Sequence, residues 1–217
     1  MMMDRVNGAL RRVPVWLVYL VAVVPPVWIF YAGVTGRLGV EPIKEMEHQI
    51  GLLGLQVLIA TLAVTPLRRL VGLNLMKFRR AMGLIGFFYI FLHLLVWLLL
   101  DVRILGQIVA DILKRPYITI GMVGFVLMVP LALTSNNLSV RKLGRKWRVL
   151  HKLVYLTLPL GALHFVMLRK GFQIEPLIYA GVVGLLLVLR IKRVAGVFDR
   201  KAPIHRVIPR SSRRDLG

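Results

Sequence analysis

Six apolar stretches, each close to the length of a bilayer-crossing helix, constrain this chain more than any other feature. They lie at about residues 14–35, 48–65, 80–100, 117–134, 150–168 and 174–191, and a transmembrane helix needs roughly 20 apolar residues. Only helices and closed barrels satisfy their backbone polar groups inside a bilayer. The sequence therefore predicts an all-α, polytopic membrane protein built as a bundle of six transmembrane helices.

The positive charges fall between these stretches and predict the orientation of the chain. If the loops alternate between the two sides, 23 of the 30 Lys and Arg residues collect on one side with both termini, and six of the nine Asp and Glu residues lie on the other. Basic loops tend to stay in the cytoplasm. We therefore expect a cytoplasmic N-terminus at 1–13, a six-helix transmembrane domain at 14–191 and a basic cytoplasmic tail at 192–217. Because the basic residues cluster between the apolar stretches, they are expected to contact the membrane surface, and nucleic acid is not an expected partner.

The sequence contains no cysteine, which excludes thiolate-bound iron–sulfur clusters and disulfides. Histidine is then the strongest side-chain ligand left for a redox metal or haem. The loops are short, and no Gly-rich phosphate-binding motif follows a strand pattern. We therefore expect electrons or energy to reach this chain from a partner or from a membrane-soluble donor.

Two histidines lie inside predicted spans at similar depth. His93 stands in the 80–100 stretch and His164 in the 150–168 stretch, and an ionisable side chain in lipid usually faces the bundle interior and has a function. At ~1.5 Å per residue they lie about 12 Å and 8 Å from the outer ends of their helices. They could supply both axial ligands of a b-type haem held between the helices. The alternative is a hydrogen bond to a neighbouring helix.

His151 begins the fifth stretch, about 20 Å before His164 along a helix. This position suits either a second, inner haem or an interfacial histidine near the lipid headgroups. An inner haem would lack a histidine partner on the third stretch, because Arg79 and Arg80 occupy the positions where one would stand. Haem number is therefore left open at one or two.

Several other residues have a simple expected role. His48, at the outer edge of the second stretch, is expected to be a solvated side chain, or else a quinone contact or a support for the outer haem. His205, in the tail, is expected to bind nothing. Arg79, Arg80 and Arg148 are expected to set topology, with ion pairs to haem propionates as the alternative. The glycines of the third and fourth stretches are expected to be helix-packing positions: Gly83, Gly86, Gly121 and Gly124.

Three regions of the chain resemble one known family. They are 79–101, which opens with Arg-Arg-x-x-Gly-Leu; 134–155, which ends with Trp-x-x-Leu-His-x-Leu-x-Tyr; and the short segments 14–16 and 65–68. The match spans nearly the whole chain. The chain is similar to the MsrQ (YedZ) family, the haem-binding membrane subunits of the periplasmic methionine sulfoxide reductase system. This family belongs to the ferric reductase-like transmembrane superfamily.

The resemblance implies a b-haem electron conduit in a bacterial inner membrane. It would pass electrons from the quinol pool to an MsrP-like periplasmic molybdenum-cofactor reductase, which reduces methionine sulfoxide in oxidised proteins. The resemblance also implies ligand roles for His93, His151 and His164, and an FMN cofactor that no residue pattern here predicts. No substrate chemistry is expected on this chain, which would be the electron-transfer subunit of an oxidoreductase complex.

Two other functions are open at this point. The chain could be a membrane ferric or quinone reductase fed by a cytosolic flavin reductase that docks on the basic loops, and its activity would then survive removal of the periplasmic partner. It could instead be a haem-free transporter or scaffold whose buried histidines serve proton relay or helix packing. No buried Asp or Glu is expected in the spans, which weighs against a proton-coupled pump.

Overall fold

The structure, a computed structural model, describes residues 2–168 and 173–194, and these residues form helices and no strand. The α-helices are Met2–Arg12 (α1), Val15–Val34 (α2), Pro42–Leu70 (α3), Arg79–Val96 (α4), Leu105–Lys114 (α5), Pro116–Leu133 (α6), Asn137–Leu143 (α7), Arg145–Leu150 (α8), Val154–Leu168 (α9) and Ile174–Val194 (α10). A π-helical segment, Trp97–Val102, continues α4, and a 3₁₀ turn, His151–Leu153, leads into α9. The all-α prediction is confirmed.

Five helical segments of the described residues are long and apolar enough to cross a membrane: Val15–Val34, Pro42–Leu70, Arg79–Val102, Pro116–Leu133 and Arg145–Leu168. Each of them overlaps one of the first five predicted spans, and the chain is a multi-pass membrane protein. The sixth predicted span, 174–191, overlaps α10, which is not among these five. The count of six therefore stays a prediction. Most of the predicted tail at 192–217, including His205, lies outside the described residues.

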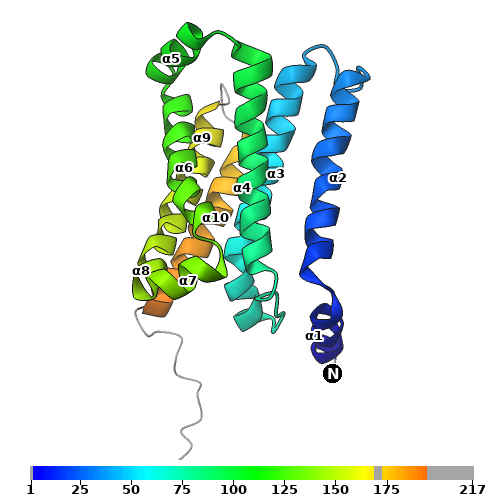
Figure 1. The fold of residues 1–217 in the computed structure, drawn as a ribbon, viewed down its shortest axis with the longest axis vertical. Coiled ribbons are helices and arrows are strands. Elements are labelled where there is room, and N and C mark those ends of the chain that lie inside the picture. Colours follow the sequence, from blue (N-terminus) through cyan, green and yellow to red (C-terminus); the bar gives the residue numbers. More distant parts are fainter. Residues whose placement is uncertain (1, 169–172, 195–217) are drawn as a thin grey trace, which may run out of the picture.

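The long helices stand side by side and run alternately up and down the bundle (Figure 1). The closest packing joins α3 to α4 and α6 to α9, while α10 packs on α9 and α3, and α2 packs on α3 and α4. Small residues permit the α3–α4 approach: a Cβ on Gly54 would overlap Ile90, and one on Gly86 would overlap Leu58. Close backbone approach of this kind drives helix association in lipid, where burial from water does not.

The two ends of the bundle differ. The basic end, which is the lower end in Figure 1, carries α1, the 71–78 loop, α7 and α8; the opposite end carries the 35–41 loop and α5. At the basic end Asn7 of α1 donates from Nδ2 to the carbonyl of Gly72 at 2.9 Å and accepts at Oδ1 from the backbone N–H of Asn74 at 2.9 Å. These bonds fix α1 against the loop that joins α3 to α4.

Two clusters of buried apolar side chains hold the bundle together. One joins α3, α9 and α10 through Leu62, Leu158, Ala162, Val183 and Leu186. The other joins α2, α3 and α4 through Ile29, Met46, Ile50 and Val96. Together they fix the mutual positions of α3, α4 and α9, the helices on which the candidate site depends.

Candidate cofactor site

His93, on α4, is held by the backbone of α3. Its Nδ1 lies 2.9 Å from the carbonyl oxygen of Glu47. A carbonyl only accepts hydrogen bonds, so Nδ1 carries the ring proton and donates it, and Nε2 keeps a free lone pair. One turn further along α3, Gly51 faces the ring, and a Cβ on this glycine would lie 2.8 Å from Nδ1. The missing side chain therefore leaves the space that the imidazole occupies.

His164, on α9, has the same surroundings on a different helix. Its Nδ1 lies 2.7 Å from the carbonyl oxygen of Tyr117 on α6, so Nδ1 again donates and Nε2 is again the free nitrogen. Gly121 follows Tyr117 by one turn, and a Cβ there would lie 2.8 Å from Nδ1 of His164. Each imidazole is thus fixed by a carbonyl and a glycine, four residues apart, on the helix packed beside it.

The two imidazoles meet between the helix pairs. The centres of the His93 and His164 rings are 6.2 Å apart, and the ring planes are nearly perpendicular, at 79°. A single metal bound by two histidine nitrogens at about 2 Å each places the ring centres about 6 Å apart. Metal-binding histidines also characteristically donate their second ring N–H to a carbonyl or carboxylate. The separation, the fixed tautomers and the nitrogen-only donor set therefore fit an axial ligand pair for haem iron.

His151 lies at the basic end in different surroundings. Its Nδ1 is 3.1 Å from the carbonyl oxygen of Trp147, four residues earlier in α8, and its Nε2 is 3.4 Å from Oγ of Ser135. The Trp147 ring stacks on the imidazole with 3.8 Å between ring centres and 25° between planes, and Trp147 Nε1 donates to the carbonyl of Thr134 at 2.9 Å. The structure thus holds His151 through Trp147 and Ser135, and does not bring it to the His93–His164 pair.

His48 lies next to Glu47 at the opposite end of the bundle. Its ring is 5.7 Å from that of Phe165, and the Phe165 ring is 5.9 Å from that of Tyr179 on α10. The Tyr179 hydroxyl accepts a hydrogen bond from Gln56 Nε2 at 2.7 Å. His48 therefore sits near the histidine pair among aromatic side chains, and the fully solvated position that the sequence favoured does not describe it.

The three arginines considered for haem propionates all lie at the basic end, beside His151. Arg80 Nη1 donates to Oδ1 of Asn137 at 2.6 Å, which ties α4 to the start of α7, and Arg148 is exposed. Arg79 stands 14 residues before His93, about 21 Å away along a helix. These arginines can serve only a cofactor at the basic end.

The sequence reasoning missed the backbone side of the site. Gly121 was expected to be a helix-packing position, but the group that it faces is the His164 ring. Gly51 was not singled out at all. The sequence contains one hint of these positions, because Gly51 follows Glu47 and Gly121 follows Tyr117 at the same spacing. Only the structure shows that both pairs lie beside the histidines.

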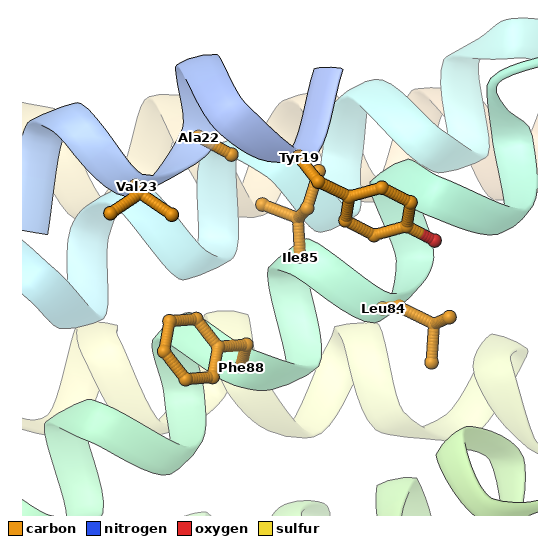
Figure 2. Close-up of a pocket in the computed structure, with 6 residues that line it drawn as sticks. All are labelled: Tyr19, Ala22, Val23, Leu84, Ile85 and Phe88. Carbon is orange, nitrogen blue, oxygen red and sulfur yellow. The ribbon is translucent and has the colours of Figure 1, made fainter. Parts of the chain in front are cut away.

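A groove on the outside of the bundle lies between α2 and α4. Figure 2 shows the side chains that line it: Tyr19, Ala22, Val23, Leu84, Ile85 and Phe88. The Tyr19 hydroxyl is the only polar side-chain group among them, so the groove offers no ligand for a metal. With this apolar lining the groove does not compete with the histidine pair as a cofactor site.

Comparison with known proteins gives consistent matches. The family described as ferric reductase like transmembrane component matches residues 48–162. The protein-methionine-sulfoxide reductase heme-binding subunit MsrQ of Brucella anthropi is 52% identical over 180 residues, which cover 82% of each chain. The MsrQ subunit of Brucella ovis is 51% identical over 179 residues, which cover 82% of this chain and 81% of the relative. No solved structure matches the chain.

Proposed function

We propose that His93 and His164 bind one b-type haem between them. The chain belongs to the MsrQ family of heme-binding subunits and contains the ferric reductase-like transmembrane component. The observation that carries this proposal is the pair itself: two imidazoles 6.2 Å apart, each with Nδ1 engaged by a backbone carbonyl. Both Nε2 atoms are left to bind the iron.

The bound haem would supply one-electron chemistry, because its iron alternates between two oxidation states. The chain contributes the rest. The Glu47 and Tyr117 carbonyls fix the ligand tautomers, and the apolar helices keep water away from the metal. Because both histidines would bind the iron, we propose an electron carrier with no substrate chemistry of its own.

We propose that electrons leave from the end of the bundle that holds the histidine pair. The basic end would face the cytoplasm, in line with the positive-inside rule, so the pair would lie near the outer face of the inner membrane. The recipient would be a periplasmic molybdenum-cofactor reductase that acts on methionine sulfoxide, and the donor would be the quinol pool. The relatives' name, heme-binding subunit of a protein-methionine-sulfoxide reductase, supports a methionine sulfoxide reductase as the recipient.

We also propose that His151 contributes to a second haem at the basic end, on the path of electrons that cross the whole membrane. The stack with Trp147 and the Nδ1 contact to the Trp147 carbonyl would orient its Nε2. The FMN that the family resemblance implies stays a prediction, and we assign no described residue to it. The boundaries of the transmembrane domain, 14–191, likewise stay a prediction.

The first experiment is the visible spectrum of the detergent-purified chain, oxidised and then reduced with dithionite. We expect a b-type spectrum that loses the contribution of the His93–His164 haem in His93→Ala and in His164→Ala, and keeps only the part that depends on His151. His48→Ala is the matched control, since it removes a neighbouring imidazole that we do not assign to the iron. A colourless wild-type chain, expressed with ample haem, would contradict the proposal and favour a haem-free transporter or scaffold.

The second experiment tests the direction of electron flow. Membrane vesicles that hold the chain are given a reduced quinol, and haem reduction is followed with and without a purified periplasmic reductase. We expect reductase-dependent reoxidation of the haem and reduction of methionine sulfoxide. Reduction of ferric iron without the reductase would instead favour the membrane ferric reductase alternative.

A further inference from the structure

Arg190, near the end of α10, is held at the basic end by neutral groups. Its Nη1 donates to the Tyr155 hydroxyl on α9 at 2.6 Å. Its Nη2 donates to two acceptors on α3, the carbonyl of Leu62 at 3.1 Å and Oγ1 of Thr65 at 3.0 Å. These bonds fix the guanidinium in position, but none of the partners carries a charge that would neutralise it.

Arg79 brings a second positive charge to the same place. It is the first residue of α4 and lies close enough to Arg190 and Tyr155 to interact electrostatically with both. Within the described residues, no carboxylate forms a hydrogen bond or ion pair with Arg79 or Arg190. Two like charges at the edge of a bilayer repel each other and are costly to remove from water. An anion between them would relieve both costs.

Around Arg190 there are more hydrogen-bond donors than acceptors. The Tyr155 hydroxyl accepts from Arg190, so its own proton is free to donate. An arginine has five N–H donors, and Arg190 uses three of them. Its Nε–H is buried without a partner, and one N–H on Nη1 remains beside Tyr155. Together with the Arg79 guanidinium, these groups can hold an anion that carries several oxygens.

We infer that Arg79, Arg190 and Tyr155 form a binding site for a phosphate-class oxyanion, supplied by the headgroup of an anionic phospholipid in the leaflet at the basic end. Tyr155 is 36% exposed and the next residue, Leu156, is 50% exposed, so the site is open to the lipid. Basic pockets between helices at the cytoplasmic surface are where anionic headgroups bind. The site lies about 21 Å along α4 from His93 and does not depend on the haem proposed there.

The test uses the full-length chain in nanodiscs that contain phosphatidylcholine with or without phosphatidylglycerol. Native mass spectrometry counts the lipids retained by the wild type, by Arg190→Gln and by Tyr155→Phe. Tyr155→Phe keeps the ring beside Arg190 and removes the hydroxyl, which disturbs the packing of α9 less than the loss of the arginine disturbs α10. The matched control is Lys142→Gln, which removes an exposed charge of α7 at the same end.

We expect the wild type and the control to retain phosphatidylglycerol in preference to phosphatidylcholine. In each site variant we expect this preference to be roughly tenfold weaker, which is the effect of losing one charge-assisted hydrogen bond. An equal preference in all four chains would overturn the inference. So would a thermal stabilisation of the wild type by inorganic phosphate alone, without any preference among lipids. The haem-free chain should show the same preference as the haem-loaded chain; a preference that haem loading abolishes would instead assign the arginines to haem propionates.

Discussion

Gly51 of α3 lies directly against the imidazole of His93, so closely that a Cβ on this glycine would be 2.8 Å from Nδ1. The Glu47 carbonyl, one turn earlier, holds the same nitrogen. Gly121 and Tyr117 repeat the arrangement around His164. The positions of the two imidazoles that would hold the haem are therefore set by the backbones of α3 and α6 as well as by α4 and α9.

The first prediction concerns these glycines. Gly51→Ala and Gly121→Ala should each push the facing imidazole away from its carbonyl, because overpacking of about one carbon forces such shifts at a cost of ~1–3 kcal/mol. We expect haem content to fall and the reduced-minus-oxidised spectrum to weaken in both variants. The measurement is the ratio of haem absorbance to protein after purification.

The control for the glycine variants comes from α10. Gly181 and Gly184 have nothing within 4 Å of the position that a Cβ would take, so Gly181→Ala and Gly184→Ala should leave haem content unchanged. Full haem occupancy in Gly51→Ala would show that the ring does not need this position, and would count against the proposed axial geometry.

The fold was predictable from the sequence because lipid leaves few choices. Apolar stretches such as 14–35 and 117–134 differ by one residue at each end from the helices Val15–Val34 and Pro116–Leu133. The second span, predicted at 48–65, is shorter than α3 at both ends, because the 42–47 and 66–70 segments, which carry charged residues, continue the helix beyond the apolar run. Hydropathy indicates which residues contact lipid, but a helix can continue past the lipid into the polar residues that follow. Hydropathy alone therefore does not predict where a helix begins or ends.

The site was predictable only in part. The depth of His93 and His164 followed from helix rise and indicated that the two rings share a layer. Which helix faces each ring depends on how α3 packs on α4 and α6 on α9, and no periodicity in one helix specifies its neighbour. Arg190 was counted only as a basic residue of the cytoplasmic side, because its partners Leu62 and Tyr155 are 128 and 35 residues away.

The second prediction concerns topology. The chain has no cysteine, so single-cysteine variants can be labelled without background. Lys142→Cys at the basic end and Lys114→Cys on α5 place exposed thiols at the two ends of the bundle. With a membrane-impermeant maleimide added to spheroplasts, we expect labelling of Lys114→Cys at once and of Lys142→Cys only after lysis. The reverse pattern would put the histidine pair on the cytoplasmic side and refute the proposed direction of electron flow.

The third prediction concerns the attachment of α2. Tyr89 on α4 is 3% exposed and donates from its hydroxyl to the carbonyl of Ala22 on α2 at 2.5 Å. Tyr89→Phe should destabilise the chain by about 1 kcal/mol, because the carbonyl loses a buried partner. The measurement is the thermal midpoint in detergent. Tyr31→Phe is the control, since Tyr31 is 49% exposed; an equal loss in both variants would mean that the Tyr89 bond contributes nothing specific.

The fourth prediction tests whether His151 has a cofactor role. Trp147→Leu removes the ring that stacks on His151, whereas Trp147→Phe keeps a stacking ring and loses only the bond to the Thr134 carbonyl. If His151 binds a second haem, Trp147→Leu should lower haem content toward one per chain, and Trp147→Phe should largely restore it. The spectrum that depends on His93 and His164 should stay unchanged in both.

A double variant makes the same test independent of general stability. Trp147→Leu combined with His151→Ala should lose no more haem than His151→Ala alone, because a ring that only orients a ligand has no effect once the ligand is gone. Trp28→Leu controls for the loss of an indole, since Trp28 is 57% exposed on α2. Equal haem content in the wild type, Trp147→Leu and His151→Ala would confine haem to the His93–His164 pair and leave His151 as an interfacial histidine.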